Sequence, residues 1–205
     1  MRIERLGRDA IRVSDLVDPA GWTNLLRPTI AESAHDVVPG ESDVVVIARP
    51  GRLDDVAALV ADLPSDRVAA AGHGGTGPEV ADVTIPVEMD GPDLGEVAER
   101  TGLTTDDVVR RILGVPLRVA FCGFSPGFAY LTGLPDELHV ARRASPRRTV
   151  PAGSLAIAAG YAAVYPSPSP GGWHLLGSTD VVVWDVDRDP PALLAPGTIV
   201  RFTTR

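Results

Sequence analysis

Residues 151–177, PAGSLAIAAGYAAVYPSPSPGGWHLLG, alternate short apolar runs with turns rich in glycine and proline. The runs Leu155–Ala159, Tyr161–Tyr165 and His174–Leu176 are too short for helices and are typical of β-strands. Similar runs lie outside this stretch, at Asp82–Val87, Leu117–Cys122, Val181–Trp184 and Thr198–Thr203. Because so many strands are interspersed with turn-forming residues, this half of the chain is predicted to be a β-barrel with long, ordered loops.

Two short helices are predicted just before residue 117. The first has Pro92 in its first turn, a position that suits proline, and ends at Gly102. The second begins at Thr104, where Asp107 three residues later completes a variant of the capping box, and it ends at Gly114.

The first part of the chain is typical of a mixed α/β domain. Asp43–Ala48 is a β-branched run that predicts a buried strand, and Leu53–Leu63 has the apolar spacing of a helix. Ala71–Pro78, with four glycines, marks an expected linker. We therefore expect two domains, residues 1–78 and residues 79–205.

Composition excludes several classes of protein. The chain has 205 residues, 44% of them hydrophobic, a net charge of −8 and a sequence pI near 4.9. An acidic chain is a poor nucleic-acid binder, because phosphate neutralisation needs clustered cations. No apolar run approaches the ~20 residues that span a membrane, and residues 1–12 do not resemble a signal peptide. We expect a cytoplasmic protein without nucleic-acid or membrane partners.

Residue types that are missing narrow the chemistry further. All 19 basic residues are arginines, so the chain contains no Walker A lysine, Schiff-base lysine or biotin-attachment lysine. Cys122 is the sole cysteine, which excludes an intrachain disulfide and a thiolate zinc cluster. The four histidines show no paired ligand spacing, so we expect no metal site.

The pentapeptide GFSPG, residues 123–127, matches the nucleophile-elbow pattern around Ser125. An elbow needs the backbone N–H after the serine for its oxyanion hole, and Pro126 has none. We therefore favour an aromatic-rich loop over a serine nucleophile. Cys122, at a strand end, is expected to be a buried small hydrophobe and not a nucleophile.

Residues 94–112 resemble a helix-turn-helix DNA reader in which Arg110 and Arg111 could contact phosphate. Asp106 and Asp107 occupy the start of the second helix, where base-contacting residues belong. A helical hairpin that caps the barrel is the favoured interpretation.

Residues 139–148, HVARRASPRR, concentrate positive charge in an acidic chain. The arginines are Arg142, Arg143, Arg147 and Arg148. Arginine recognises carboxylate or phosphate through two parallel N–H bonds, so the segment predicts either an anion site or a solvated basic loop. Nearby acidic residues are expected to form a solvated face: Glu79, Asp82, Glu88, Asp90 and Asp93.

Three longer motifs resemble the allophanate hydrolase subunit 1 family. They read GFSPGFAYLTGLP, SPRRTVPAGSLAIAAG and YPSPSPGGWHLLGST, between Gly123 and Thr179. IPVEMDGPDLGEVA, residues 85–98, is similar to the start of the same domain. The likeness covers about residues 36–203. The family includes the B-type component of bacterial 5-oxoprolinase, inhibitors of sporulation kinases, and part of the carboxyltransferase region of urea carboxylase.

The resemblance implies an α+β fold, with a small ferredoxin-like N-terminal domain and a cyclophilin-like C-terminal β-barrel. It also implies that the chain is the B-type component of an ATP-dependent complex that opens 5-oxo-L-proline to L-glutamate. The partners would be a homologous C-type component and a separate LamB-like A-type component, with the chain inactive alone.

The family pattern also marks expected site residues, although no catalytic residue is identified. Substrate or anion binding is expected at Arg142, Arg147, Gly127, Phe128, Pro151, Gly153, Ser154 and Tyr165. The loop that ends in Gly171, Gly172 and Trp173 is expected to present a surface, with Trp173 itself favoured as a core anchor over an interface anchor.

One departure from the pattern keeps alternatives open. Ala162-Ala163 stand where the family carries a Gln-Thr pair. This favours a non-catalytic regulatory module that resembles the kinase inhibitors as the second hypothesis. A third is a carboxyltransferase-type subunit that works with a biotin-bearing partner.

Overall fold

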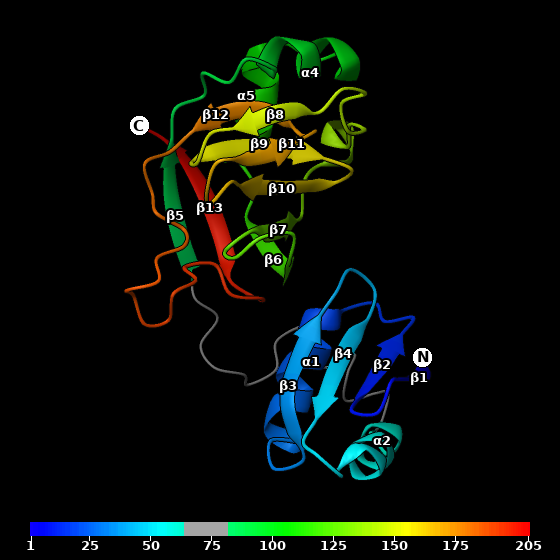
Figure 1. Ribbon diagram of the computed structural model, residues 1–205. Coiled ribbons are helices and arrows are strands. Elements are labelled where there is room, and N and C mark those ends of the chain that lie inside the picture. The colour runs from blue at the N-terminus through cyan, green and yellow to red at the C-terminus, as the bar shows by residue number, and fades with distance from the viewer. Residues whose placement is uncertain (64–81) are drawn as a thin grey trace. The chain divides into compact units, whose positions relative to one another are not determined.

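The computed structural model describes residues 1–63 and 82–205. The chain divides into two compact units, Met1–Val80 and Ala81–Arg205. The linker predicted at Ala71–Pro78, and with it the domain boundary after residue 78, lies outside the described residues. Each unit is described separately below (Figure 1).

The N-terminal unit is an antiparallel four-stranded sheet with two helices. Its elements are β1 (Arg2–Leu6), β2 (Ala10–Ser14), α1 (Pro19–Thr29), β3 (Ala34–Pro39), β4 (Val44–Ala48) and α2 (Leu53–Ala61). The strand order is β1-β2-β4-β3. The strand predicted at Asp43–Ala48 and the helix predicted at Leu53–Leu63 are therefore present, as β4 and α2.

One hydrophobic cluster holds this unit together. Ile11 and Val44, which are fully buried, face Leu26 of α1 and Val56 of α2, so both helices cover the same side of the sheet. Strands β1, β2 and β3 and helix α1 were not predicted. Strand β3, for example, is AHDVVP, in which charge and proline mask the alternation that marks a half-buried strand.

The C-terminal unit is built on a seven-stranded sheet of order β12-β9-β10-β7-β6-β13-β5. The strands are β5 (Asp82–Val87), β6 (Leu117–Cys122), β7 (Ala129–Thr132), β9 (Ser154–Ala158), β10 (Tyr161–Val164), β12 (His174–Ser178) and β13 (Ile199–Thr204). The remaining elements are α4 (Leu94–Thr101), α5 (Thr105–Leu113), η1 (Asp136–Leu138), and the two-stranded sheet of β8 (Arg147–Val150) and β11 (Ser169–Gly171).

The two ends of the seven-stranded sheet almost meet. Glu88, just after β5, exchanges two backbone hydrogen bonds of 2.8 Å with Ser178 at the end of β12. The Thr179 hydroxyl donates a third bond, of 2.6 Å, to the carbonyl of Pro86. The sheet is thus a nearly closed barrel, and the α+β class predicted from the sequence is confirmed.

Strands β9 and β10 are buried on both faces because two layers cover them. Leu155, Ile157 and Val164 point into the barrel core, whereas Ala156 and Ala163 point toward a second cluster beneath β8 and β11. Figure 1 shows the β8–β11 pair lying across the barrel strands. The small alanines leave room for the aromatic side chains of that second cluster.

Helices α4 and α5 form the predicted hairpin against the barrel, with Val97 and Ile112 in its core. The Thr104–Asp107 capping box is complete, and Gly102 ends α4 with a φ of 70°. One detail of the prediction is wrong. Helix α4 begins at Leu94 with Asp93 as its N-cap residue, so Pro92 precedes the helix and is not in its first turn.

The strand predicted at Val181–Trp184 is also absent, and only an isolated bridge between Trp184 and Ala192 is found there. The reason lies in Arg188, whose guanidinium donates to the carbonyls of Val182 at 3.1 Å and Pro191 at 2.8 Å. These side-chain bonds satisfy the loop carbonyls that a neighbouring strand would otherwise pair.

Candidate functional site

The site is built where the chain before α4 lies on strand β12. A Cβ atom at Gly91 would overlap the Leu175 carbonyl oxygen, so only glycine permits this approach. The backbone N–H of Gly91 donates to Leu176 at 3.0 Å, and that of Asp93 donates to Leu175 at 3.1 Å. These bonds place the Asp93 side chain over the barrel wall.

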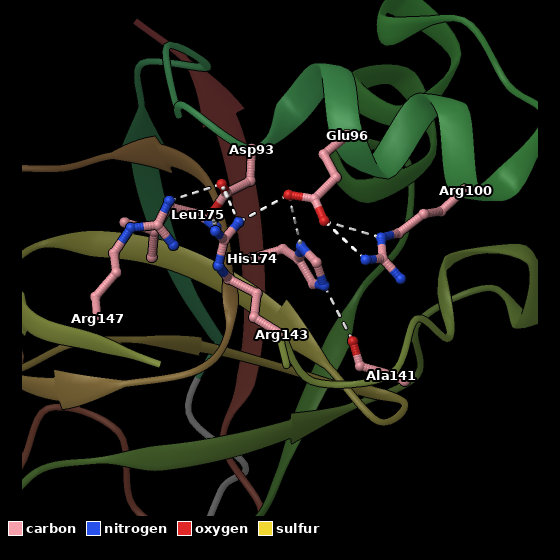
Figure 2. Close-up of polar contacts among 8 residues, drawn as sticks. All are labelled: Asp93, Glu96, Arg100, Ala141, Arg143, Arg147, His174 and Leu175. Atoms are coloured by element: carbon pink, nitrogen blue, oxygen red, sulfur yellow. Dashed lines mark hydrogen bonds and ion pairs between the residues drawn. The ribbon is translucent and has the colours of Figure 1, made fainter. Parts of the chain in front are cut away.

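Asp93 is 3% exposed and its carboxylate accepts hydrogen bonds on both oxygens. Oδ1 accepts from Arg143 Nη1 and from Arg147 Nη2, each at 2.7 Å, and Oδ2 accepts from the Leu175 N–H at 2.7 Å (Figure 2). Burial would raise the pKa of Asp93, but the hydrogen bonds from Arg147 and Leu175 and the charges of both arginines hold it below its usual value. Asp93 is therefore a buried anion that fixes two cations.

Glu96, in the first turn of α4, extends this network toward solvent. Its Oε2 accepts from Arg143 Nη1 at 2.7 Å, and its Oε1 accepts from Arg100 Nε at 3.0 Å. The hydrogen bond from Arg100 and the positive charge of Arg143 lower the pKa of Glu96 against the effect of desolvation. Glu96 is thus an ionised second carboxylate beside Asp93.

His174 lies beneath the network and is completely buried. Its Nε2 is 3.0 Å from the carbonyl oxygen of Ala141, so Nε2 carries the proton and donates. Its Nδ1 is 4.0 Å from Glu96 Oε2 and makes no hydrogen bond within the described residues. His174 therefore joins β12 to the segment that carries the arginines.

An aromatic cluster lies where β8 packs against strands β9 and β10. The Phe128 ring packs edge-on against Tyr165 at 5.2 Å and against Trp173 at 5.6 Å between centroids. Burial, and next the neighbouring Tyr130, raise the pKa of Tyr165, whereas the charges of Arg142 and Arg147 act in the opposite direction. The charges of both arginines thus act on the Tyr165 phenol.

The structure brings some of the predicted site residues together. Arg147 pairs with Gly171 in the β8–β11 register, and a Cβ atom at Gly171 would overlap the Tyr165 hydroxyl oxygen. Arg142 is exposed, and Trp173 is 5% exposed in the aromatic cluster, as the core-anchor interpretation predicted. Gly172 accepts a 2.8 Å hydrogen bond from the Arg143 N–H. An anion site that uses Arg142 and Arg147 stays a prediction.

Among the described residues, Gly127, Gly153 and Ser154 make no hydrogen bond with these arginines, and the structure shows a packing or turn role for each. Gly127, with a φ of 77°, lies against the Trp184 side chain. Gly153, also at 77°, lies against the Thr179 carbonyl. The Ser154 hydroxyl donates to the Pro151 carbonyl at 2.9 Å, which closes the turn before β9.

The centre of the network was not predicted from the sequence. Asp93 was expected on a solvated face, and this is wrong, because Asp93 is buried and ion-paired. Asp82, Glu88 and Asp90 are exposed as predicted, and Glu79 lies outside the described residues. No local signal separates Asp93 from Glu88, Asp90 and Glu96, which share the segment IPVEMDGPDLGEVA with it.

Ser125 and Cys122, which the sequence disfavoured as nucleophiles, have no activating partner among the described residues. Ser125 Oγ is buried without a hydrogen-bond partner among the described residues. Burial raises the pKa of the Cys122 thiol to about 11, and the thiol donates to the Leu194 carbonyl at 3.4 Å. A nucleophile needs an adjacent base or a lowered pKa, and neither is present at these two positions.

We expect Ser125→Ala to retain most of the activity of an assembled complex, because Ser125 Oγ contacts no base. The measurement is the steady-state rate of the variant beside wild type, with circular dichroism to show intact folding. A loss of ~1000-fold, the scale expected for an essential nucleophile, would contradict this interpretation.

Two further features of the described residues bear on function. They contain no group of three or more His, Cys, Asp or Glu side chains arranged to hold a metal ion. None of their helices combines the length and the apolar character needed to cross a membrane.

Residues 7–194 match the family model of the carboxyltransferase domain, subdomains C and D, and the chain belongs to this family. It is 48% identical over 128 residues to the B-type subunit of 5-oxoprolinase from Escherichia coli O157:H7, a match that covers 61% of this chain and 59% of that relative. It is 40% identical over 112 residues to the corresponding 5-oxoprolinase component of Bacillus subtilis, with 55% and 47% covered. The matched segments thus span about half of these curated relatives.

Solved structures share the fold. A crystal structure of TTHA0988 superposes with a TM-score of 0.78 at 32% identity, covering 96% of this chain and 39% of that one. A conserved uncharacterized protein from Pyrococcus horikoshii gives a TM-score of 0.59 at 28% identity, with 100% and 97% covered. Urea carboxylase from Kluyveromyces lactis gives a TM-score of 0.64 at 17% identity, covering 99% of this chain and 21% of that one. At this identity the match shows a shared fold and nothing more.

Proposed function

We propose that this chain is a B-type subunit of a cytoplasmic 5-oxoprolinase complex. The observation that carries the proposal is the 48% identity to the B-type component of a 5-oxoprolinase across 128 residues. The reaction would open the ring amide of 5-oxo-L-proline by adding water across its C–N bond, giving L-glutamate, while ATP is hydrolysed. The partners would be a homologous C-type subunit and a LamB-like A-type subunit.

The arginine segment suits a supporting role in that chemistry. A lactam is unreactive toward water, and transfer of a phosphoryl group from ATP to its oxygen would supply a leaving group. Negative charge then develops at the reacting centre, where guanidinium groups can stabilise it. Arg147 and Arg142, whose charges act on the Tyr165 phenol, are the residues we propose for this contact. ATP would bind to the assembled complex.

The loop before Trp173 is the proposed contact with the C-type subunit. Prolines stiffen Pro166–Pro170 and lower the entropy lost when the loop presents a surface. Permanent complexes bury on the order of 2,000 Å² or more, so we expect association to be stable to chromatography.

Reconstitution tests this proposal. The chain would be co-expressed with the C-type and A-type subunits encoded beside it, and the mixture analysed by size exclusion and by 5-oxoproline-dependent release of ADP and glutamate. We expect a stable complex whose activity requires all subunits, with each of them omitted in turn as the control. A chain that remains monomeric beside its C-type neighbour and supports no activity would defeat the proposal.

That negative result would favour the second candidate, a non-catalytic binding module. The observation behind this candidate is the Ala162-Ala163 pair in place of Gln-Thr. Both alanines are completely buried on β10, one facing the barrel core and the other the aromatic cluster.

We expect Arg147→Lys to lower kcat/KM of the complex by about 10- to 100-fold, because lysine cannot keep the Asp93 bond and contact a ligand in two directions. Arg148→Lys is the matched control, since Arg148 is exposed on the same strand. Equal rates in the two variants would exclude a special role for Arg147.

A further inference from the structure

Unpaired buried polar atoms concentrate around Asp93. Among the described residues, five buried side-chain nitrogen or oxygen atoms lack a hydrogen-bond partner. Three of them are Arg143 Nε, Arg147 Nη1 and His174 Nδ1, which all belong to this one network. Two of the three, Arg143 Nε–H and Arg147 Nη1–H, are donors. Buried donors are nearly always paired in folded proteins, so this pair indicates a missing acceptor.

The geometry explains which donors remain open. Arg143 Nη1 bridges Asp93 Oδ1 and Glu96 Oε2, and Arg147 Nη2 reaches the same Oδ1, all at 2.7 Å. The two guanidinium groups therefore converge on one oxygen atom, as Figure 2 shows. Because a guanidinium is a rigid plane, these bonds also fix the directions of Arg143 Nε–H and Arg147 Nη1–H.

The charge balance shows what kind of acceptor is missing. Three guanidinium groups, of Arg100, Arg143 and Arg147, are balanced by the two carboxylates of Asp93 and Glu96. The network therefore carries one net positive charge, with Arg143 and Arg147 mostly buried and Arg100 at its exposed edge. A ligand here would therefore be an anion.

We propose that the open N–H groups of Arg143 and Arg147 form a seat for the carboxylate of a small organic acid, with Asp93 as the residue that positions both arginines. Two fixed N–H donors and one uncompensated charge match a singly charged group with two oxygens. A phosphate, with more charge and more oxygens, would leave acceptors unpaired at such a site. The seat uses Arg143, which the family pattern did not mark, in addition to Arg147.

The identity of the acid rests on the proposed function. In 5-oxo-L-proline the lactam is neutral, and the carboxylate is the sole charged group. A seat for that carboxylate would occupy Arg147 Nη1 and hold the ring in one orientation, which leaves Arg142 as the arginine to stabilise charge at the lactam. Orientation of this kind contributes to rate by keeping the reacting atoms in place.

Binding to the full chain alone tests the seat without partner subunits. The readout is the side-chain Nε–H signal of Arg143 in nitrogen-15 NMR spectra, identified by its loss in Arg143→Lys. We expect 5-oxo-L-proline to shift this signal saturably, and its methyl ester and inorganic phosphate not to. Arg147→Lys should weaken the response at least ~10-fold, and Arg148→Lys should leave it unchanged.

The outcomes separate the seat from the proposed function. No shift with 5-oxo-L-proline, or an equal shift with the ester or with phosphate, would overturn the carboxylate seat even if the reconstituted complex is active. A carboxylate-dependent shift together with an inactive complex would support the seat and defeat the oxoprolinase assignment. If Arg143→Lys does not fold, through-bond correlation from the assigned backbone identifies the same signal in the wild type.

Discussion

Asp93→Asn is expected to destabilise the C-terminal unit by about 3–5 kcal/mol, the usual cost of removing one partner from a buried ion pair. The Asp93 carboxylate uses both of its oxygens as acceptors. One accepts from the two arginines and the other accepts from the Leu175 N–H. An amide has one acceptor oxygen, so its NH₂ group would face either the guanidinium groups or the Leu175 N–H. Neither orientation satisfies the donors that the aspartate holds.

The pH dependence of stability gives the same residue a second signature. The hydrogen bonds and charges at Asp93 keep its folded-state pKa below the unfolded value. The unfolded state therefore binds more protons in acid, and stability rises with pH. The contribution of Asp93 is complete above the usual aspartate pKa and is lost as the pH falls through the lower folded-state pKa. Glu96, Asp107 and Glu137 have pKa values lowered in the same direction and add to this acid sensitivity.

Urea unfolding of wild type and Asp93→Asn, followed by circular dichroism at pH 7 and between pH 5 and 3, measures both effects. We expect the difference between the two proteins to be largest at pH 7 and to shrink in acid. The control is Asp106→Asn, which removes an exposed carboxylate from the first turn of α5. A cost at Asp93 no greater than at Asp106 would show that the network contributes little to stability.

Local signals predicted much of the C-terminal unit. The capping box at Thr104 acts over three residues, and strands β6, β9 and β10 are apolar enough to be read from composition alone. Strands β8 (RRTV) and β11 (SPG) carry no such signal, because they are short and polar and form by pairing with each other. Their existence depends on tertiary contacts that a local pattern does not contain.

The candidate site was only partly predictable for the same reason. The cluster of arginines was visible as a run of like charge, but its partner Asp93 lies 54 positions before Arg147. In the sequence Asp93 is one of several acids, and only the fold distinguishes it from the exposed Asp90. Several motif residues that the resemblance marked as a site have packing roles in the structure, as Gly153 illustrates.

Gly153→Ala is expected to destabilise the C-terminal unit by roughly 3–4 kcal/mol. Gly153 has a φ of 77°, a backbone conformation that costs a residue with a Cβ atom about 1–2 kcal/mol. The added Cβ would also overlap the carbonyl oxygen of Thr179, so the backbone there would have to move. The Thr179 backbone cannot move easily, because two hydrogen bonds hold it. Its N–H donates to the Gly153 carbonyl at 2.9 Å, and its hydroxyl donates to the Pro86 carbonyl at 2.6 Å, where the barrel closes.

Gly102→Ala is the matched control for this variant. Gly102 has a similar φ of 70°, but a Cβ atom there would meet nothing within 4 Å, so only the backbone cost of about 1–2 kcal/mol applies. Equilibrium unfolding of both variants separates conformation from overlap, and we expect Gly153→Ala to be the more destabilised by at least ~2 kcal/mol. Equal losses would mean that the Thr179 segment can move freely. Gly153 would then have no packing role beyond its backbone conformation, and a direct contact with ligand would again be the better explanation for its place in the VPAGS motif.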